Sequence, residues 1–163
     1  IVCLAIPLYQ QLKRIRQQLV PLLISSVIGC VVGVVSVVGI AWAMGAPKDI
    51  ILSLAPKSVT TPIAMEVSRT IGGIPALTSC VVIFVGIFGA IYGYMILRKT
   101  RINSPIAQGL SIGMSAHAVG TSKSMDISNS YCAFSTLGLI INGILTAVLT
   151  PYLVMLMQAI LGF

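Results

Sequence analysis

The chain has 163 residues, of which 57% are hydrophobic and only 8% are charged, and its formal net charge is +7. A soluble globular domain carries about 25% charged residues, so this composition excludes a soluble enzyme, a disordered tail and a disulfide-linked secreted module. Most of the basic residues lie in two short clusters beside apolar runs, Lys13, Arg14 and Arg16 in one and Arg98, Lys99 and Arg101 in the other. This arrangement argues against an extended basic surface that binds nucleic acid. Such clusters are typical of cytoplasmic loops, so the sequence predicts an integral membrane protein.

The chain starts inside an apolar stretch, residues 1–9. About nine residues cannot cross a hydrocarbon core that needs about 20, so we expect the second half of a span whose start precedes Ile1. The stretch lacks the charged leader and cleavage site of a signal peptide. Three longer uncharged runs follow, and each is long enough to span a bilayer: Val20–Met44, Ile74–Leu97 and Cys132–Met157. Pro151 predicts a kink near the end of the third run.

Two half-polar stretches, Asp49–Gly73 and Ser104–Ser130, separate these runs. Each has two short apolar arms around a centre rich in Ser, Thr, Gly and Pro. A helical arm of about 10 residues is about 15 Å long, half the thickness of the hydrocarbon core. The sequence therefore predicts an all-α membrane protein, one domain over residues 1–163, with long transmembrane helices and two broken or re-entrant hairpins.

The positive-inside rule favours a re-entrant first hairpin, because a crossing segment would place the two basic clusters on opposite sides of the membrane. Full crossing stays open as the alternative. At an offset of 60 residues, 59–68 aligns with 119–128 through four identical pairs: Val59/Val119, Thr61/Thr121, Met65/Met125 and Ser68/Ser128. Two related hairpins entering from opposite faces would form an inverted repeat, an architecture common among secondary transporters.

The centre of the first hairpin is the leading candidate for a substrate site. Pro56 and Pro62 disfavour helix at the residues before them, and open backbone at membrane depth is tolerated only inside protein or beside a watery cavity. A helix beginning at Pro62 would direct its positive dipole end at the gap, where a carboxylate binds well. The candidate substrate-binding residues are Lys57, Ser58, Thr60, Thr61 and Pro62. Alternatively, Lys57 reaches an interface or pairs with an acidic residue.

The centre of the second hairpin offers similar groups. We expect Gly120 to supply a turn with positive φ and Thr121 or Ser122 to cap the following helix. An unperturbed imidazole gains or loses a proton near neutral pH, so we expect His117 to contact substrate or couple protons, or else to donate to a carbonyl in the hairpin. The candidate substrate-binding residues here are His117, Gly120, Thr121, Ser122 and Lys123.

Glu66 and Asp126 occupy matching positions in the two hairpins. Buried charges are normally paired, so we favour ion pairs with Lys57, Lys123 or Arg69 over a role in cation or proton coupling. The G-xxx-G pairs Gly29/Gly33, Gly89/Gly93 and Gly109/Gly113 indicate close helix packing, and Asn142 indicates an interhelical hydrogen bond. The scattered cysteines and the single histidine form no metal or catalytic pattern, so we expect no enzyme, metal or cofactor.

The motifs in the two hairpins and the run between them resemble the LrgB/CidB family of bacterial membrane proteins. They are KSVTTPIAMEVS (57–68), GGIPALTSCVVIFVGIFGAIYG (72–93), GLSIGMSAHAVGTSKSMD (109–126) and CAFS (132–135). The resemblance covers nearly the whole chain and departs at Cys132, where relatives often have glycine. It implies a multi-pass protein of the bacterial inner membrane that lacks about two N-terminal spans of the family.

Family members are called antiholin-like, from a proposed control of murein hydrolase export and cell lysis. A plastid relative is a glycolate/glycerate translocator, and some bacterial relatives are linked to pyruvate uptake. From this resemblance and the broken hairpins, we expect a secondary carrier or facilitator of small organic monocarboxylates. The alternative is a holin-like or antiholin-like regulator of lysis. Expected partners are the lipid bilayer, a small organic anion, further copies in a homo-oligomer and a small LrgA/CidA-type membrane protein, but no nucleic acid.

Overall fold

The computed structural model describes residues 5–162, which form eight α-helices and no strand. The helices are α1 (Ala5–Gln10), α2 (Leu12–Gln17), α3 (Leu19–Ala43), α4 (Lys48–Leu54), α5 (Thr61–Ile71), α6 (Pro75–Lys99), α7 (Pro105–Met125) and α8 (Asn129–Leu161). The prediction of an all-α fold is confirmed. The first residues of the predicted N-terminal half-span, and Cys3, lie outside the described residues.

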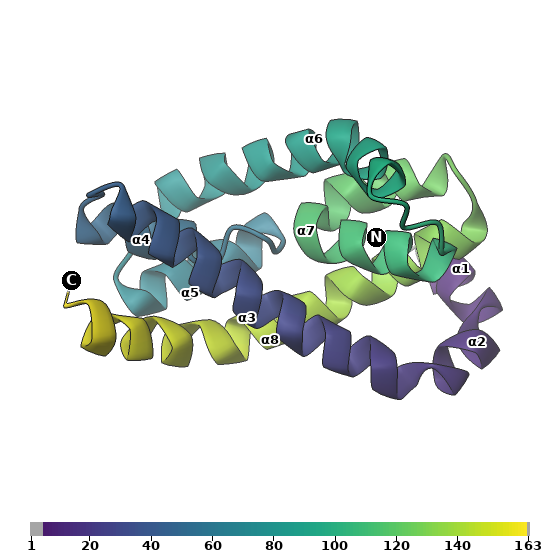
Figure 1. The fold of residues 1–163 in the computed structure, drawn as a ribbon, viewed down its shortest axis with the longest axis horizontal. Coiled ribbons are helices and arrows are strands. Elements are labelled where there is room, and N and C mark those ends of the chain that lie inside the picture. The colour runs from purple at the N-terminus through teal and green to yellow at the C-terminus, as the bar shows by residue number, and fades with distance from the viewer. Residues whose placement is uncertain (1–4, 163) are drawn as a thin grey trace.

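Three of the helices, α3, α6 and α8, are long and apolar enough to cross a membrane. Their bounds lie close to those of the three uncharged runs in the sequence. Helix α8 has 33 residues, so at about 1.5 Å per residue it is longer than the hydrocarbon core is thick. Pro151 lies within this helix. In Figure 1, α3 and α8 run along the long axis of the molecule, and α6 lies above them.

The first half-polar stretch folds as two short helices with a break between them. Helix α4 has 7 residues and α5 has 11, so neither reaches across a hydrocarbon core at about 1.5 Å per residue. Residues 55–60 form the break, and Thr60 is extended at φ −62° and ψ 144° directly before α5. The position between the two prolines is the one that the sequence predicts, because neither proline can continue a preceding helix.

A buried hydroxyl group ties α4, α5 and α6 together. Thr78 Oγ1 in α6 is hydrogen-bonded to the Ser53 carbonyl oxygen at 2.9 Å and to Ser68 Oγ at 2.7 Å. The Ile74 N–H donates to Ser53 Oγ at 2.7 Å. Gly73 fits beside this group because an added Cβ would lie 2.6 Å from Ser68 Oγ. These contacts fix the direction in which both short helices point.

The second half-polar stretch is one helix, α7, interrupted at His117, where φ is 41° and ψ is −134°. The prediction of a positive-φ turn at Gly120 is wrong: this glycine has helical torsions, and its missing Cβ makes room for Ala116 and Ile112. The prediction that Thr121 or Ser122 caps a helix is also wrong. Their hydroxyls donate to carbonyls four residues earlier, because the helix resumes directly after His117.

Helix α7 packs tightly between α6 and α8 through glycines. An added Cβ at Gly93 of α6 would lie 2.4 Å from the Ile112 side chain, and one at Gly113 of α7 would lie 1.9 Å from the Ser135 carbonyl oxygen. The predicted packing role therefore holds for Gly89/Gly93 and Gly109/Gly113. It does not hold for Gly33, which has no atom within 4 Å of an added Cβ, because this glycine faces a cavity instead.

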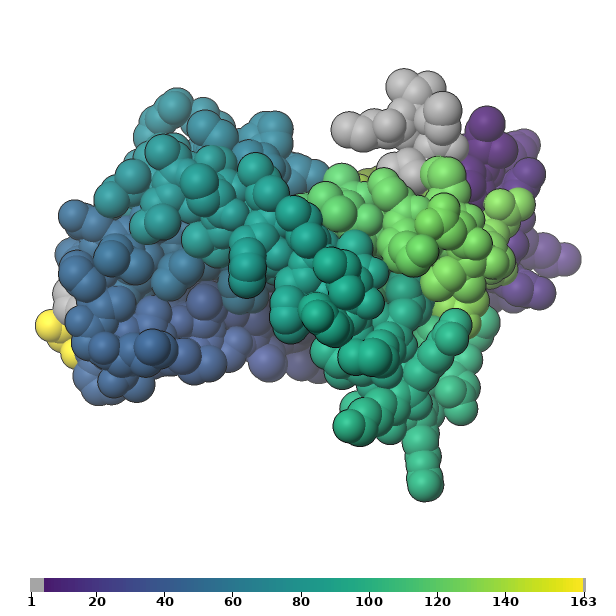
Figure 2. All heavy atoms as spheres, turned by 90° about the horizontal axis from the view of Figure 1, so that it is seen from above, coloured from purple at the N-terminus to yellow at the C-terminus, as the bar shows by residue number. Residues whose placement is uncertain are grey.

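The outer face of α6 is apolar. The exposed side chains Phe84, Phe88 and Ile91 lie along this helix, which crosses one face of the molecule in teal in Figure 2. Monomeric soluble proteins rarely expose apolar patches of this kind. An apolar face on a long helix whose only charges lie in its last turn is consistent with contact to lipid.

Candidate ligand site

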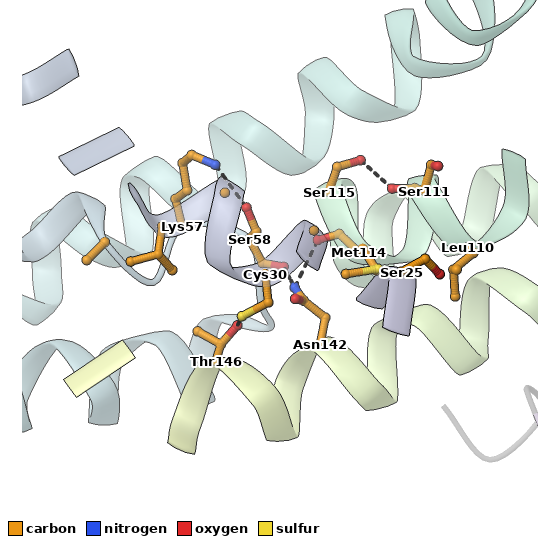
Figure 3. A pocket seen from close by; sticks show the side chains of 14 residues that line it. Ser25, Cys30, Lys57, Ser58, Leu110, Ser111, Met114, Ser115, Asn142 and Thr146 are labelled. Carbon is orange, nitrogen blue, oxygen red and sulfur yellow. Dashed lines mark hydrogen bonds between the residues drawn. The ribbon is translucent and has the colours of Figure 1, made fainter. Parts of the chain in front are cut away.

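A cavity of about 320 Å³ lies where the α4–α5 break meets α3, α7 and α8. This volume is at the lower end of the range for small-molecule pockets, about 300–1,000 Å³. Figure 3 shows its lining side chains, most of which are small or polar. They are Ser25, Gly29, Cys30, Gly33, Val34, Ala55, Lys57, Ser58, Leu110, Ser111, Met114, Ser115, Asn142 and Thr146.

Lys57 places a positive charge at this cavity. Its ammonium group donates to the neighbouring Ser58 Oγ at 3.0 Å. Within residues 5–162, no carboxylate lies within ion-pair distance of it, so the alternative of pairing with Glu66 or Asp126 does not hold. A charged side chain inside a membrane protein without a counter-charge is costly. A cavity with such a group in its wall favours an anionic occupant.

Asn142 joins the break to α7. Its Nδ2 donates to the Ser58 carbonyl oxygen and to the Met114 carbonyl oxygen, both at 2.9 Å. Figure 3 shows the asparagine on α8 between these two segments. The side chain is only 2% exposed, and the predicted interhelical hydrogen bond is confirmed. The two interrupted segments therefore meet at the middle of α8, beside the cavity.

Two of the ten predicted substrate-binding residues, Lys57 and Ser58, line this cavity. Thr60, Thr61 and Pro62 form the start of α5 next to it. His117 instead faces α6, where its Nε2 lies 2.9 Å from the Val82 carbonyl oxygen. The rest of the second group lies in the C-terminal part of α7, away from the lining of this cavity: Gly120, Thr121, Ser122 and Lys123.

Glu66 and Asp126, which occupy matching positions in the two hairpins, are each paired locally. Glu66 Oε1 accepts from Arg69 at 2.8 Å, and Asp126 Oδ2 accepts from Lys123 at 3.2 Å. All four side chains are more than half exposed. Both carboxylates thus have a cation three residues away on their own segment, and Lys57 has no carboxylate partner among the residues that the structure describes.

Several residues that line the cavity were not predicted as part of the substrate site, although a sequence pattern marks them. Small or polar residues recur every four positions on otherwise apolar helices, and residues four apart share one helix face. These sets are Ser25, Gly29 and Gly33 on α3, Ser111 and Ser115 on α7, and Asn142 and Thr146 on α8. A search for this period would have found three walls of the cavity.

The torsions of His117 lead to a stability prediction. A non-glycine residue at such a sparsely populated φ/ψ costs about 1–3 kcal/mol, so His117→Gly should be more stable than His117→Ala by about 1 kcal/mol. At the exposed helical position Ser122, the order should reverse, because glycine is about 1 kcal/mol worse than alanine inside a helix. Thermal unfolding of the four variants in detergent measures both differences. Equal orders at the two positions would contradict the kink at His117.

Comparison with known proteins gives one family. Residues 1–156 match the model of the LrgB-like family. The chain is 38% identical over 156 residues to a protein named "Holin-like protein CidB" of Staphylococcus epidermidis, and 36% identical to one of the same name of Staphylococcus aureus. In both cases 96% of this chain and 68% of the relative are covered.

Not every relative carries a functional name. A protein of Haemophilus influenzae named "Uncharacterized protein" is 39% identical over 93% of this chain and 66% of its own length. No solved structure matches the chain. The chain spans about two thirds of the length of the curated relatives that it matches.

Proposed function

Because the chain belongs to the LrgB-like family, we propose that it acts as a holin-like membrane protein that regulates murein hydrolase export and cell lysis. The carrying observation is its 38% identity, over 96% of its length, to a relative named holin-like. This name favours the regulator of lysis, which was the alternative in the sequence analysis, over the carrier. Three helices suited to membrane spanning support the location in a membrane.

The test is the lysis behaviour of a bacterium that carries the full-length protein. Deletion of the gene should change the murein hydrolase activity in the culture fluid and the rate of autolysis, and a restored copy should reverse both changes. Identical hydrolase activity and autolysis with and without the gene would refute the regulator.

The cellular setting is part of the same proposal. We place the protein in the bacterial inner membrane with several passes, as a homo-oligomer and beside a small LrgA/CidA-type partner. The long apolar helices α3, α6 and α8 support the membrane location. The basic clusters before α3 and at the end of α6 support a cytoplasmic position for the loops that carry them. Co-purification of the two proteins after mild solubilisation tests the association. The partner should not be recovered from cells that lack this protein.

A second function, a carrier or facilitator of small organic monocarboxylates such as pyruvate, glycolate or glycerate, is favoured by one specific observation. Lys57 lines a cavity of about 320 Å³ and has no carboxylate partner within residues 5–162. A protein that acted only through apolar spans would have no reason to hold a cation there at a cost of about 2.5–3.5 kcal/mol.

The carrier proposal includes two re-entrant hairpins related as an inverted repeat. It is supported by two interruptions, the break at residues 55–60 and the kink at His117. The offset of 60 residues that aligns 59–68 with 119–128 also places His117 opposite Lys57, within the first break. Asn142 is hydrogen-bonded to Ser58 in the first break and to Met114, which lies three residues before the kink at His117. Attachment of impermeant reagents to single cysteines placed in each segment tests from which side each hairpin is reached.

Lys57→Ala tests the carrier directly. Uptake of labelled pyruvate or glycolate into liposomes should fall at least tenfold, because a hydrogen bond or ion pair to a charged group contributes about 1.5–3 kcal/mol. Lys48→Ala, an exposed lysine at the start of α4, is the matched control and should retain wild-type uptake. Equal flux through wild-type and Lys57→Ala protein would refute the carrier site, whereas free leakage of dye would favour a holin-like pore.

A further inference from the structure

A second cavity, of about 310 Å³, lies between α6 and α7. Large apolar side chains of α6 line it, among them Phe84, Phe88 and Ile96, and all three are exposed. Gly89 and Gly93 also line it and carry no side chain that could fill it. The cavity therefore opens on the outer face of the helix pair, and we call it the α6–α7 groove.

The walls of the α6–α7 groove suit a hydrocarbon chain. Among the described residues that line it, only Ser111 and Ser115 on α7 are polar, and Ser115 Oγ donates to the Ser111 carbonyl oxygen at 2.7 Å. The rings of Phe84 and Phe88 stack along α6 with their centroids 6.4 Å apart. A polar ligand would lose its hydration here and gain few hydrogen bonds in return, so the walls favour an apolar occupant.

The groove is about as long as one leaflet of the hydrocarbon core. Its lining residues on α6 run from Phe84 to Leu97, a rise of about 20 Å at about 1.5 Å per residue. The acyl chains of one leaflet cover half of a core about 30 Å thick, or about 15 Å. A single acyl chain that lies parallel to α6 therefore covers most of the groove.

Three cations stand at one end of the groove. Arg98 and Lys99 follow Leu97 directly, and Arg101 lies two residues further along the chain. All three are exposed, and none has a carboxylate within ion-pair distance among residues 5–162. The helix dipole favours cations in the last turn of α6 but does not neutralise them. The charge at this end therefore favours an anionic head group next to the apolar groove.

The backbone after α6 holds Arg101 in a fixed turn. The Arg101 N–H donates to the Arg98 carbonyl oxygen at 3.0 Å. The Ile102 N–H donates to the Leu97 carbonyl oxygen, also at 3.0 Å. In this arrangement the residue with positive φ is usually glycine, whereas here it is Arg101, at φ 61°. The cations therefore start from a hydrogen-bonded turn at the end of the groove and not from an irregular loop.

We propose that the α6–α7 groove binds an anionic phospholipid of the cytoplasmic leaflet, with one acyl chain along α6 and the phosphate held by Arg98, Lys99 and Arg101. Basic residues next to membrane helices attract the anionic lipids of this leaflet. A water-soluble phosphate would leave the apolar groove unfilled, so the occupant is a lipid. The inference concerns the outer face of the protein and applies to the regulator of lysis and to the carrier alike.

The bound lipid lies against the same part of α7 as the candidate ligand site. Ser111 and Ser115 line both the α6–α7 groove and the cavity beside Lys57. A lipid that binds the folded helix pair but not the unfolded chain stabilises the fold. The unfolding temperature of the purified protein therefore reports whether the groove is occupied.

The first test adds single lipids to the delipidated full-length protein in detergent micelles. Dioleoyl phosphatidylglycerol and dioleoyl phosphatidylcholine have the same acyl chains, but only the first carries a net negative charge. The anionic lipid should bind about tenfold more tightly, since each basic residue near the head group adds to the attraction, and should raise the unfolding temperature further. Native mass spectrometry counts the bound lipids. Equal affinity for the two lipids would overturn the proposal.

Two triple variants test whether the preference comes from this site or from net charge. The first removes the cations at the end of the groove and should bring the two lipid affinities together: Arg98→Gln, Lys99→Gln and Arg101→Gln. The matched control removes the same charge from the other basic cluster and should keep the preference: Lys13→Gln, Arg14→Gln and Arg16→Gln. An equal loss of preference in both variants would indicate attraction by net charge alone and would contradict the site.

A photoreactive phosphatidylglycerol locates the lipid on the wild-type protein, so this test does not depend on how the variants fold. With a diazirine in one acyl chain, it should label peptides that contain residues 84–97 or 111–115. Even labelling of α3, α6 and α8, or no labelling of the groove because other parts of the full-length protein cover it, would refute the site. Glycerophosphoglycerol, the same head group without acyl chains, should not raise the unfolding temperature. A rise equal to that with the lipid would show that the groove takes no part.

Discussion

Replacement of Gly113 by alanine is expected to destabilise the protein by about 3 kcal/mol or more, the upper end of the cost of overpacking a core. The added Cβ would lie 1.9 Å from the Ser135 carbonyl oxygen and 2.9 Å from Ser135 Cα. These are backbone atoms of α8, so no side-chain rotation relieves the clash, and α7 must move away from α8. Unfolding of the purified protein in mixed micelles with increasing denaturing detergent measures the loss.

Gly39→Ala is the matched control for this change. An added Cβ at Gly39 in α3 meets no atom within 4 Å, so the same methyl group should leave stability unchanged or raise it slightly, since alanine favours helix. A similar small effect of both substitutions would contradict the close approach of α7 and α8. The contrast matters for the site, because this packing holds Met114, the α7 partner of Asn142, against the cavity.

The membrane helices and the first break could be predicted from local sequence alone. Uncharged runs predict α3, α6 and α8, because a segment in lipid must form its backbone hydrogen bonds internally, as a helix does, and must carry apolar side chains. Pro56 and Pro62 define the α4–α5 break because proline removes a donor and restricts the residue before it. In each case the physical cause lies within the segment itself, and the structure agrees with the predicted position.

The second interruption and the make-up of the cavity depend on contacts between segments far apart in sequence. His117 has the positive φ expected for Gly120, and its ring is hydrogen-bonded to Val82 of α6, a contact that no local propensity reveals. Lys57 and Lys123 are both predicted from the sequence to bind substrate. The structure distinguishes them, because Lys123 is paired with Asp126 three residues away, whereas Lys57 lies at a cavity and has no carboxylate partner within residues 5–162.

The second large effect is expected for Lys57→Met, which should raise the free energy of unfolding relative to wild-type without ligand and lower it relative to wild-type when an organic anion is bound. Methionine keeps the length of the side chain but removes the charge. Since a central charge costs about 2.5–3.5 kcal/mol in a membrane span, and Ser58 Oγ offsets part of this by accepting from Lys57, the ligand-free variant should be about 2 kcal/mol more stable than wild-type. Unfolding in lipid nanodiscs without any organic anion measures this gain.

The same substitution should abolish the stabilisation that an anion gives to the wild-type protein. A ligand at 100 times its Kd stabilises by about 2.7 kcal/mol, so excess lactate should reverse the order of the two proteins. Lys48→Met removes an exposed lysine outside the cavity and should keep the lactate response. A ligand-free Lys57→Met protein less stable than wild-type, or one that still responds to lactate, would contradict the site. A bound anion would offset the cost of holding this cation, so the reversal of order with lactate is the result that distinguishes a ligand site from a lysine with a structural role.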